Sequence, residues 1–394
     1  MTRRNRLDIA VVGGGVVGAA CALALSELGL EVALVEAQAP QPWRADRPDL
    51  RVYAFAPDNA ALLQRSGVWT SVVAARVQPY RRMRVWDATG GSELQFDADA
   101  FGRNELGWIV EHGLLVDRLW AALPAANVRL HCPARVEALE QLQDGARLRL
   151  DDGSRIDANL VIAADGAESS VRALAGLEVD AHSYAQRGVV AYVETEHPHE
   201  QTAWQRFLPT GPLAFLPCAD AASSIVWTLP EAEAARVMSL DDAAFDRELT
   251  AAFDARLGST RVVSKRAAFP LRRQLAREYA IGRVLVIGDA AHVVHPLAGQ
   301  GVNLGLRDVA ALRDAIGQAR SRRADYASPQ RLARWARTRK SENAAAAHAF
   351  DGINRLFSND GVAATLLRGP LLGLAGRLPP IAHGLWRRAA GLQP

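Results

Sequence analysis

A run of glycines near the start of the chain has the spacing needed to bind phosphate groups. Gly13, Gly15 and Gly18 form GxGxxG directly after an apolar stretch at 9–12. In such a fingerprint the first glycine permits a tight turn, the second lets the backbone approach a pyrophosphate, and the third lets a helix pack closely on a strand. The helix that follows directs free N–H groups at the phosphates. We expect these glycines, together with Val17 in that helix, to contact a dinucleotide.

A carboxylate at Glu36 completes this first site. The residue ends a strand expected at 31–36, eighteen positions after Gly18, where an acidic side chain can hold the hydroxyls of a ribose. The same charge would repel a 2′-phosphate, so NADP is disfavoured at this position. A plain glycine-rich turn is the structural alternative, but the strand, helix and carboxylate around it favour a dinucleotide. The fingerprint alone does not separate NAD from FAD.

A second carboxylate stands at the end of another apolar stretch. Gly288 and Asp289 follow the residues at 284–287. A strand that delivers Gly-Asp places the acidic side chain at the mouth of the sheet, where it can accept hydrogen bonds from the ribityl chain of a flavin. Asp is also favoured at the N-cap of a helix, and the two roles are compatible. This motif favours FAD over a simple NAD dehydrogenase.

The loop and helix start at 295–308 combine glycine, proline and polar residues. This constrained backbone can point N–H groups at a ligand, and the helix adds the positive end of its dipole. A reduced flavin is anionic around N1 and the C2 carbonyl, so this field would stabilise it. A purely structural loop is the less favoured reading. The candidate catalytic residues are His295, Pro296, Gly299 and Gln300, and the candidate cofactor contacts are Gly288, Pro296, Gly301, Val302 and Asn303.

These motifs resemble those of a known enzyme family. Residues 295–308 match the HP-[LIV]-[AG]-GQGxNxGxxD signature of the ubiquinone-biosynthesis hydroxylases, the UbiH, UbiF and UbiI group, at every specified position. Residues 164–172 resemble the DGxxSxVR motif of group A flavoprotein monooxygenases, and residues 49–54 resemble the segment that brings an arginine to the flavin. The segments 204–217 and 350–358 are also similar, so the likeness covers essentially the whole chain.

The resemblance implies a set of cofactor contacts. It implies that residues 296–301 line the isoalloxazine and that Asp165 and Arg172 serve both FAD and NAD(P)H. Relatives often carry Asn and Gln where this chain has His112 and Val116, so a flavin contact from that segment is not carried over. The residues implied to bind FAD are Gly13, Gly15, Gly18, Glu36, Arg51 and Asp289.

The elements that must position these residues begin with a β-α-β unit. Its first strand is continuously apolar, which is typical of a parallel sheet buried on both faces. The segment 181–282 has a different residue pattern, with strand candidates on either side of a turn at 209–212. This pattern favours an antiparallel-rich second domain. The other expected elements are strands at 9–12, 31–36, 160–164 and 284–287 and a helix at 15–28.

The predicted fold class is therefore α/β: a Rossmann-like FAD-binding domain with an inserted antiparallel-sheet substrate domain, of the p-hydroxybenzoate-hydroxylase type that the resemblance implies. The FAD-binding domain is expected at 1–76, 106–180 and 283–394, the last with C-terminal helices. The substrate domain is expected at 77–105 and 181–282, and its first segment is placed by the resemblance alone. Core packing is favoured over a pocket wall for its large aromatic residues, which are Trp204, Phe207, Phe215 and Trp227.

Composition limits the classes of function. The chain has 394 residues and a net charge of +3, too weak a basic balance to argue for nucleic acid. Cys21, Cys132 and Cys218 lie far apart without CxxC spacing, which argues against a disulfide framework and against a metal site. The short charged N-terminus is unlike a signal peptide, and no apolar run reaches the ~20 residues of a membrane span. We expect a cytoplasmic protein.

A C-terminal segment bears on membrane contact and on partners. Four apolar residues fall on one helical face beside Arg387 and Arg388, a pattern typical of an interfacial helix at the inner face of a membrane. Packing on its own domain or on a partner subunit is an equally good reading. A complex with other ubiquinone-biosynthesis proteins and a homo-oligomer both stay open. The apolar residues are Ile381, Leu385, Ala389 and Leu392.

The chemistry implied by the resemblance belongs mainly to the cofactor. NAD(P)H reduces FAD, O2 adds at flavin C4a, and the hydroperoxide hydroxylates the aromatic ring of a polyprenylated phenol or quinol. The protein must exclude water and place the ring carbon near the distal oxygen. A structural hydrogen-bonding role is favoured for His292 and His295, and no base is identified. Two alternatives stay open: a related hydroxylase of a soluble aromatic substrate, and a non-catalytic FAD-bound assembly subunit.

Overall fold

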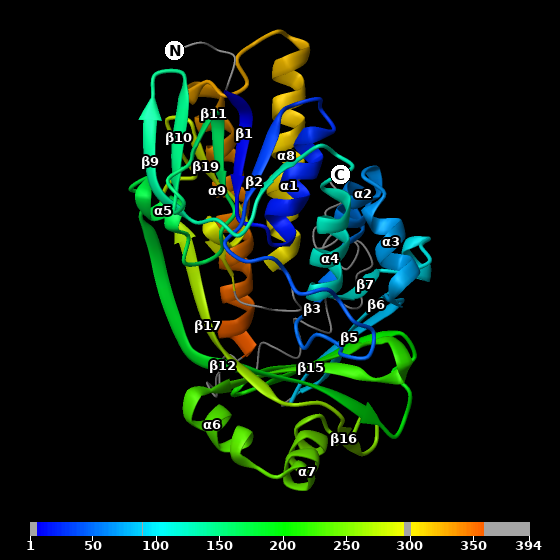
Figure 1. Cartoon of the computed structure of the whole chain (residues 1–394). Coiled ribbons are helices and arrows are strands. Elements are labelled where there is room, and N and C mark those ends of the chain that lie inside the picture. The colour runs from blue at the N-terminus through cyan, green and yellow to red at the C-terminus, as the bar shows by residue number, and fades with distance from the viewer. Residues whose placement is uncertain (1–5, 89, 295–300, 358–394) are drawn as a thin grey trace.

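Two large sheets lie in opposite halves of an elongated molecule (Figure 1). The structure, a computed structural model, describes residues 6–88, 90–294 and 301–357. A largely parallel sheet packed with long helices forms one half, and a largely antiparallel sheet covered by two short helices forms the other. The expected α/β fold with an antiparallel second sheet is therefore confirmed.

The first sheet is largely parallel. Its strands are β1 (Leu7–Val12), β2 (Val32–Val35), β8 (Arg129–His131), β9 (Val136–Leu142), β10 (Gly145–Leu150), β11 (Arg155–Ala163), β18 (Ala280–Ile281) and β19 (Val284–Val286). They take the order β18-β19-β11-β1-β2-β8, with β10 and β9 extending β11 as an antiparallel edge. The central strands β1, β2 and β19 are apolar and buried along almost their whole length, as a parallel sheet covered on both faces requires.

Long helices pack on this first sheet. The helices of this half are α1 (Val16–Ser26), α2 (Pro57–Arg65), α3 (Val68–Ala75), α4 (His112–Ala122), α5 (Ser170–Leu174), α8 (Gly301–Ser321) and α9 (Pro329–Phe357). α1 contacts the sheet, α4 and α8, so it has almost no face left for water. That is why the helix is apolar nearly all round, with every residue from Gly18 to Leu25 buried.

The second sheet is mostly antiparallel. Its strands are β5 (Arg82–Asp87), β6 (Gly90–Asp97), β12 (Val179–Thr195), β13 (Thr202–Leu208), β14 (Gly211–Pro217), β15 (Ser223–Pro230), β16 (Thr260–Val262), β17 (Ala267–Ala276) and β20 (His292–Val293). They take the order β20-β17-β12-β15-β14-β13-β5-β6, and β16 pairs with β12. Two helices, α6 (Glu231–Ser239) and α7 (Asp242–Ala252), pack on this sheet. Phe215 stacks on Phe253 at 3.8 Å between ring centroids, at the centre of the resulting core.

A small third sheet lies between the two halves. It consists of β3 (Val52–Phe55), β7 (Gly107–Glu111) and β4 (Gln78–Tyr80), in the order β3-β7-β4. Alternate side chains of β3 enter different cores, since Tyr53 and Phe55 join the core of the first sheet. Ala54 instead packs with Tyr192 and Leu216 of the second sheet. One short strand therefore carries contacts from one half of the molecule to the other.

The C-terminal segment at 381–392, for which a membrane contact and packing on a protein surface both stay open, lies outside the described residues. Among the helices of the described ranges, none is both long enough and apolar enough to cross a bilayer.

The core under α7 gives a test of packing in the second half. Phe245 is fully buried, and Phe269 on β17 is 54% exposed. We expect Phe245→Ala to lower the free energy of unfolding by about 3–5 kcal/mol because it leaves a cavity. The matched change Phe269→Ala is expected to have an effect within about 0.5 kcal/mol. Urea unfolding followed by circular dichroism measures both, and equal losses at the two positions would contradict this core.

Candidate functional site

The glycine-rich turn after β1 is shaped by close backbone contacts. Gly13 has a φ of +105°, and a Cβ there would lie 2.4 Å from the carbonyl oxygen of Ala164. A Cβ on Gly18 would lie 1.9 Å from the carbonyl oxygen of Gly13. A Cβ on Gly15, in contrast, would meet no atom within 4 Å. The turn is therefore packed tightly on its inner side and leaves open space at the N-terminus of α1, where no side chain caps the helix.

The open side of the turn is bordered by Glu36. Its Oε2 accepts a hydrogen bond from the Gly14 N–H at 2.5 Å, and its Oε1 accepts one from the Gln38 N–H at 3.0 Å. The indole Nε1 of Trp120, on α4, donates to the Gly14 carbonyl at 2.7 Å. Gly14 is therefore held on both sides, and the carboxylate stands at the end of β2, beside the glycine-rich turn.

Arg51 and Asp289 meet across the same opening. The closest guanidinium nitrogen of Arg51 lies 4.0 Å from Oδ2 of Asp289, and the two side chains are 57% and 44% exposed. The Arg51 guanidinium also stands 5.4 Å from the centre of the Tyr53 ring, whose hydroxyl hydrogen-bonds Nδ1 of His112 at 2.9 Å. Burial, with a smaller contribution from Arg51, lowers the pKa of His112 to about 4. A neutral His112 therefore accepts the Tyr53 hydroxyl and adds no charge near Arg51.

Asp49 fixes the segment that carries Arg51. Its Oδ1 accepts the Arg51 N–H at 2.9 Å, and its Oδ2 accepts the Gly113 N–H in the first turn of α4 at 3.0 Å. Its own N–H donates to Glu111 Oε2 at 2.9 Å. Its carbonyl accepts the hydroxyl of Tyr192, from β12, at 2.8 Å. The arginine is thereby tied to β7, to α4 and to the second sheet.

Asp165 and Arg172 organise the loop after β11. Asp165 accepts hydrogen bonds from the hydroxyls of Ser169 and Ser170 and from the Val171 N–H. Arg172 is 7% exposed and donates to the carbonyls of Ala167 and Ala290, at 2.9 Å each. Since Ala290 follows Asp289, this hydrogen bond holds the loop against the Gly288-Asp289 turn after β19.

The start of α8 supports the site from behind. Asn303 is fully buried; its Oδ1 accepts the Ala56 N–H at 3.0 Å and its Nδ2 donates to the Ala54 carbonyl at 2.8 Å, which ties α8 to the end of β3. Val302 is also buried, and Gly301 faces open space. Val17 packs against Gly288 and Gly305. The predicted residues His295, Pro296, Gly299 and Gln300 lie outside the described residues.

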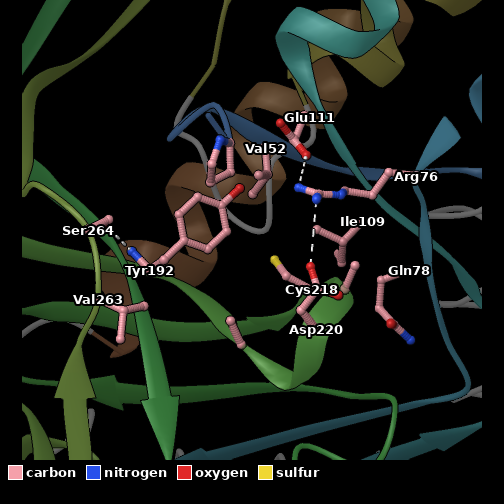
Figure 2. Close-up of a pocket in the computed structure, with 13 residues that line it drawn as sticks. Val52, Arg76, Gln78, Ile109, Glu111, Tyr192, Cys218, Asp220, Val263 and Ser264 are labelled. Carbon is pink, nitrogen blue, oxygen red and sulfur yellow. Dashed lines mark hydrogen bonds and ion pairs between the residues drawn. The ribbon is translucent and has the colours of Figure 1, made fainter. Parts of the chain in front are cut away.

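A cavity of about 140 Å³ opens between the small third sheet and the second sheet. Figure 2 shows Tyr192 reaching toward Val52, the neighbour of Arg51, with Ile109 and Cys218 on the other walls. Burial raises the pKa of the Cys218 thiol to about 12, so the thiol is uncharged. The charged groups gather at one end and are Arg76, Glu111 and Asp220, with Arg76 at 3.4 Å from Glu111 and 3.6 Å from Asp220.

Among the residues of the cavity wall, Val52 lies in the motif segment 49–54, whereas Tyr192, Cys218 and Arg76 belong to no motif. These three residues come from separate segments and are brought together by tertiary contacts. The aromatic residues considered as walls from sequence lie elsewhere. Phe215 and Trp227 are in the core with α7, Trp204 packs against that core, and Phe207 is buried away from the cavity lining. The favoured core-packing role is confirmed for Phe215, Trp204 and Trp227.

Comparison with known proteins agrees with this geometry. The family described as an FAD binding domain matches residues 6–347. The 3-demethoxyubiquinol 3-hydroxylase of Escherichia coli is 40% identical over 355 residues, which cover 90% of each chain. The ubiquinone hydroxylase UbiL of Rhodospirillum rubrum is 37% identical over 98% of this chain and 89% of its own.

The fold also has a solved counterpart. The p-nitrophenol 4-monooxygenase PnpA of Pseudomonas putida superposes with a TM-score of 0.78 over 98% of both chains, at 20% sequence identity. At that identity the likeness shows the fold alone, whereas the matches to the relatives show the family. The chain therefore belongs to the FAD-binding-domain family and, within it, to the FAD-dependent hydroxylases of ubiquinone biosynthesis.

Proposed function

We propose that this protein is an FAD-dependent monooxygenase that hydroxylates the aromatic ring of a polyprenylated phenol or quinol in ubiquinone biosynthesis. The observation that carries the proposal is the convergence, at one edge of the parallel sheet, of an open helix N-terminus, Glu36 and the Arg51–Asp289 pair. A ring-sized cavity opens beside Val52, the residue after Arg51.

The described residues fit FAD segment by segment. The pyrophosphate binds at the N-terminus of α1, where Gly15 leaves room, Gly13 and Gly18 allow the close turn, and Val17 supports it. Glu36 holds the ribose, and Asp289 holds the ribityl chain beside Arg51. Asp165, Gly288 and Gly301 are further proposed cofactor contacts, and the buried residues Arg172, Val302 and Asn303 are proposed to support them.

The contacts that we propose for the flavin ring are based on the sequence motif at 295–308. Residues 296–301 are proposed to line the isoalloxazine, and His295, Pro296, Gly299 and Gln300 are the proposed catalytic residues. When bound, FAD takes electrons from NAD(P)H and supplies the oxygen-activating chemistry with O2. The protein's own part is to orient the ring, to exclude water and to hold charge away from the apolar walls.

The cavity suits a single aromatic ring. Its volume of about 140 Å³ is close to the roughly 150 Å³ of an apolar cavity known to bind benzene. Val52, Ile109 and Tyr192 give it apolar walls, and the Tyr192 hydroxyl is already used by the Asp49 carbonyl. We assign the substrate ring to this cavity. A prenyl tail would leave through the open mouth, next to Val263, which is 43% exposed.

We further propose how the chain is divided and where it works. Residues 77–105 and 181–282 form the substrate domain, and the rest forms the FAD-binding domain. A lipid substrate places the enzyme in the cytoplasm at the inner face of the membrane, with a complex of biosynthetic proteins or a second copy of this chain as its partners.

Loss of the gene tests the substrate class. We expect cells without it to contain less ubiquinone and to accumulate a prenylated phenol that lacks one oxygen, as measured by mass spectrometry of lipid extracts. The missing oxygen identifies the ring carbon. An unchanged quinone profile in a strain without a paralogue would refute the assignment to ubiquinone.

The role of Glu36 can be measured directly. Glu36→Ala removes the carboxylate that we propose accepts hydrogen bonds from the ribose. The change is therefore expected to weaken FAD binding by about 10- to 100-fold, or roughly 1.5–3 kcal/mol. Flavin fluorescence during titration of the apoprotein reports the dissociation constant. Glu31→Ala is the matched control, since Glu31 is an exposed partner of Arg129. Equal effects of the two changes would rule out a ribose contact.

Filling the cavity should separate substrate binding from cofactor binding. Ala222 lines the cavity, so Ala222→Phe is expected to lower kcat/KM for a short-tailed prenyl phenol by about tenfold or more, equal to ~1.4 kcal/mol. FAD affinity should not change. The control is Ala243→Phe on the exposed side of α7, which should leave both quantities unchanged. Normal turnover by the Ala222 variant would show that the substrate ring does not bind in this cavity.

A further inference from the structure

The carboxylate of Asp308 is fully buried and receives four hydrogen bonds. Its Oδ2 accepts the Gly288 N–H at 3.1 Å and Nε2 of His292 at 2.6 Å. Its Oδ1 accepts Nε of Arg339 at 2.8 Å and Nδ2 of Asn343 at 3.0 Å. One side chain of α8 thus joins the turn after β19, the strand β20 and helix α9.

A buried charge of this kind costs much free energy unless it is paired and fully hydrogen-bonded. Arg339 supplies the opposite charge and also contacts Glu342 and Asn343. The interactions with His292 and Arg339 hold the pKa of Asp308 at about 2, despite the opposing effect of burial. The carboxylate is therefore ionised at neutral pH, and both of its oxygens are in use.

The turn after β19, which Asp308 binds through the Gly288 N–H, is conformationally restricted. Gly288 has a φ of +58°, in the left-handed region. A Cβ on Gly305 would lie 2.6 Å from Cγ2 of Val17 and 3.2 Å from Cα of Gly288, so α1, α8 and the turn are in direct contact. The next residue, Asp289, points the other way, with a side chain that is 44% exposed and faces Arg51.

We infer that Asp308 is a positioning residue: its carboxylate holds the Gly288 N–H so that the adjacent Asp289 faces the ribityl chain of FAD. The inference rests on the cofactor role proposed above for Asp289. Asp308 binds the backbone of the turn, so its hydrogen bond orients Asp289 and leaves the Asp289 carboxylate free for the ligand.

The variant Asp308→Asn tests this contact, and it also removes the negative charge that faces Arg339. Its amide oxygen can still accept from Arg339 and Asn343. Its amide nitrogen can donate to His292 once the ring proton moves from Nε2 to Nδ1, which has no partner among the described residues. Of the four groups that donate to Asp308, only the Gly288 N–H would then face the N–H of the new amide in place of an acceptor. We expect the FAD dissociation constant to rise about tenfold, or ~1.4 kcal/mol, and the visible absorption and circular dichroism of the bound flavin to change.

Asn343→Leu is the matched control. It removes a partner of the same carboxylate on the Oδ1 side and leaves the Gly288 contact in place. We expect lower thermal stability with FAD affinity within about twofold of the parent and an unchanged flavin spectrum. If both variants weaken FAD binding in proportion to their loss of stability, Asp308 is only structural and the inference is overturned.

The remaining outcomes separate this inference from the proposed function. If the parent and Asp308→Asn bind FAD equally well with the same spectrum, the positioning role is overturned and the proposed function stands. If the purified parent takes up no FAD at all, the proposed cofactor site fails and the inference fails with it.

Discussion

The parallel half of the molecule depends on one close contact between backbone and backbone. α1 approaches the turn after β1 so closely that only glycine fits at position 18, and the same turn presses on Ala164 at the end of β11. The ends of β1 and β11 are therefore locked at a single edge of the sheet. Because the carboxyl ends of parallel strands share one edge, the residues that follow β1, β2, β11 and β19 collect around one opening.

Asp49 supports both the segment that carries Arg51 and the wall of the cavity. Asp49 holds Arg51 on one side and receives the hydroxyl of Tyr192 on the other, while Glu111 binds the Asp49 N–H and borders the cavity. The cavity wall residues Tyr192 and Glu111 are thus each linked through Asp49, by two hydrogen bonds, to the arginine that stands beside Asp289. The two halves of the molecule meet through a few named polar contacts and the small third sheet.

Sequence was most informative where chemistry and geometry are local. The glycine spacing, Glu36 and Gly288-Asp289 each sit at the end of a strand, and a turn of that kind constrains residue types within a few positions. The helix expected at 15–28 spans Val16–Ser26, and the strand expected at 284–287 spans Val284–Val286.

The cavity could not be found in this way. Tyr192, Arg76 and Cys218 meet through long-range tertiary contacts, and none of the three belongs to a motif. The parallel pairing of β5 with β13 and the three-stranded sheet of β3, β7 and β4 likewise depend on tertiary contacts. The network around Asp308 joins its carboxylate to the turn after β19, to β20 and to α9, and no sequence motif marks the members on α9, Arg339 and Asn343.

The strand β12 runs for seventeen residues and pairs with β17 along most of its length, from the region of the first sheet into the second (Figure 1). At about 3.3 Å per residue it spans roughly 56 Å. Its ladder with β17 is interrupted once, between Ser183 and Gln186, where Ala185 has a φ of +51°. Before that interruption β12 pairs with β17 alone, whereas from Gln186 onward it also pairs with β15. The stretch of β12 nearest the first sheet is therefore held by fewer cross-strand hydrogen bonds than the stretch inside the second sheet.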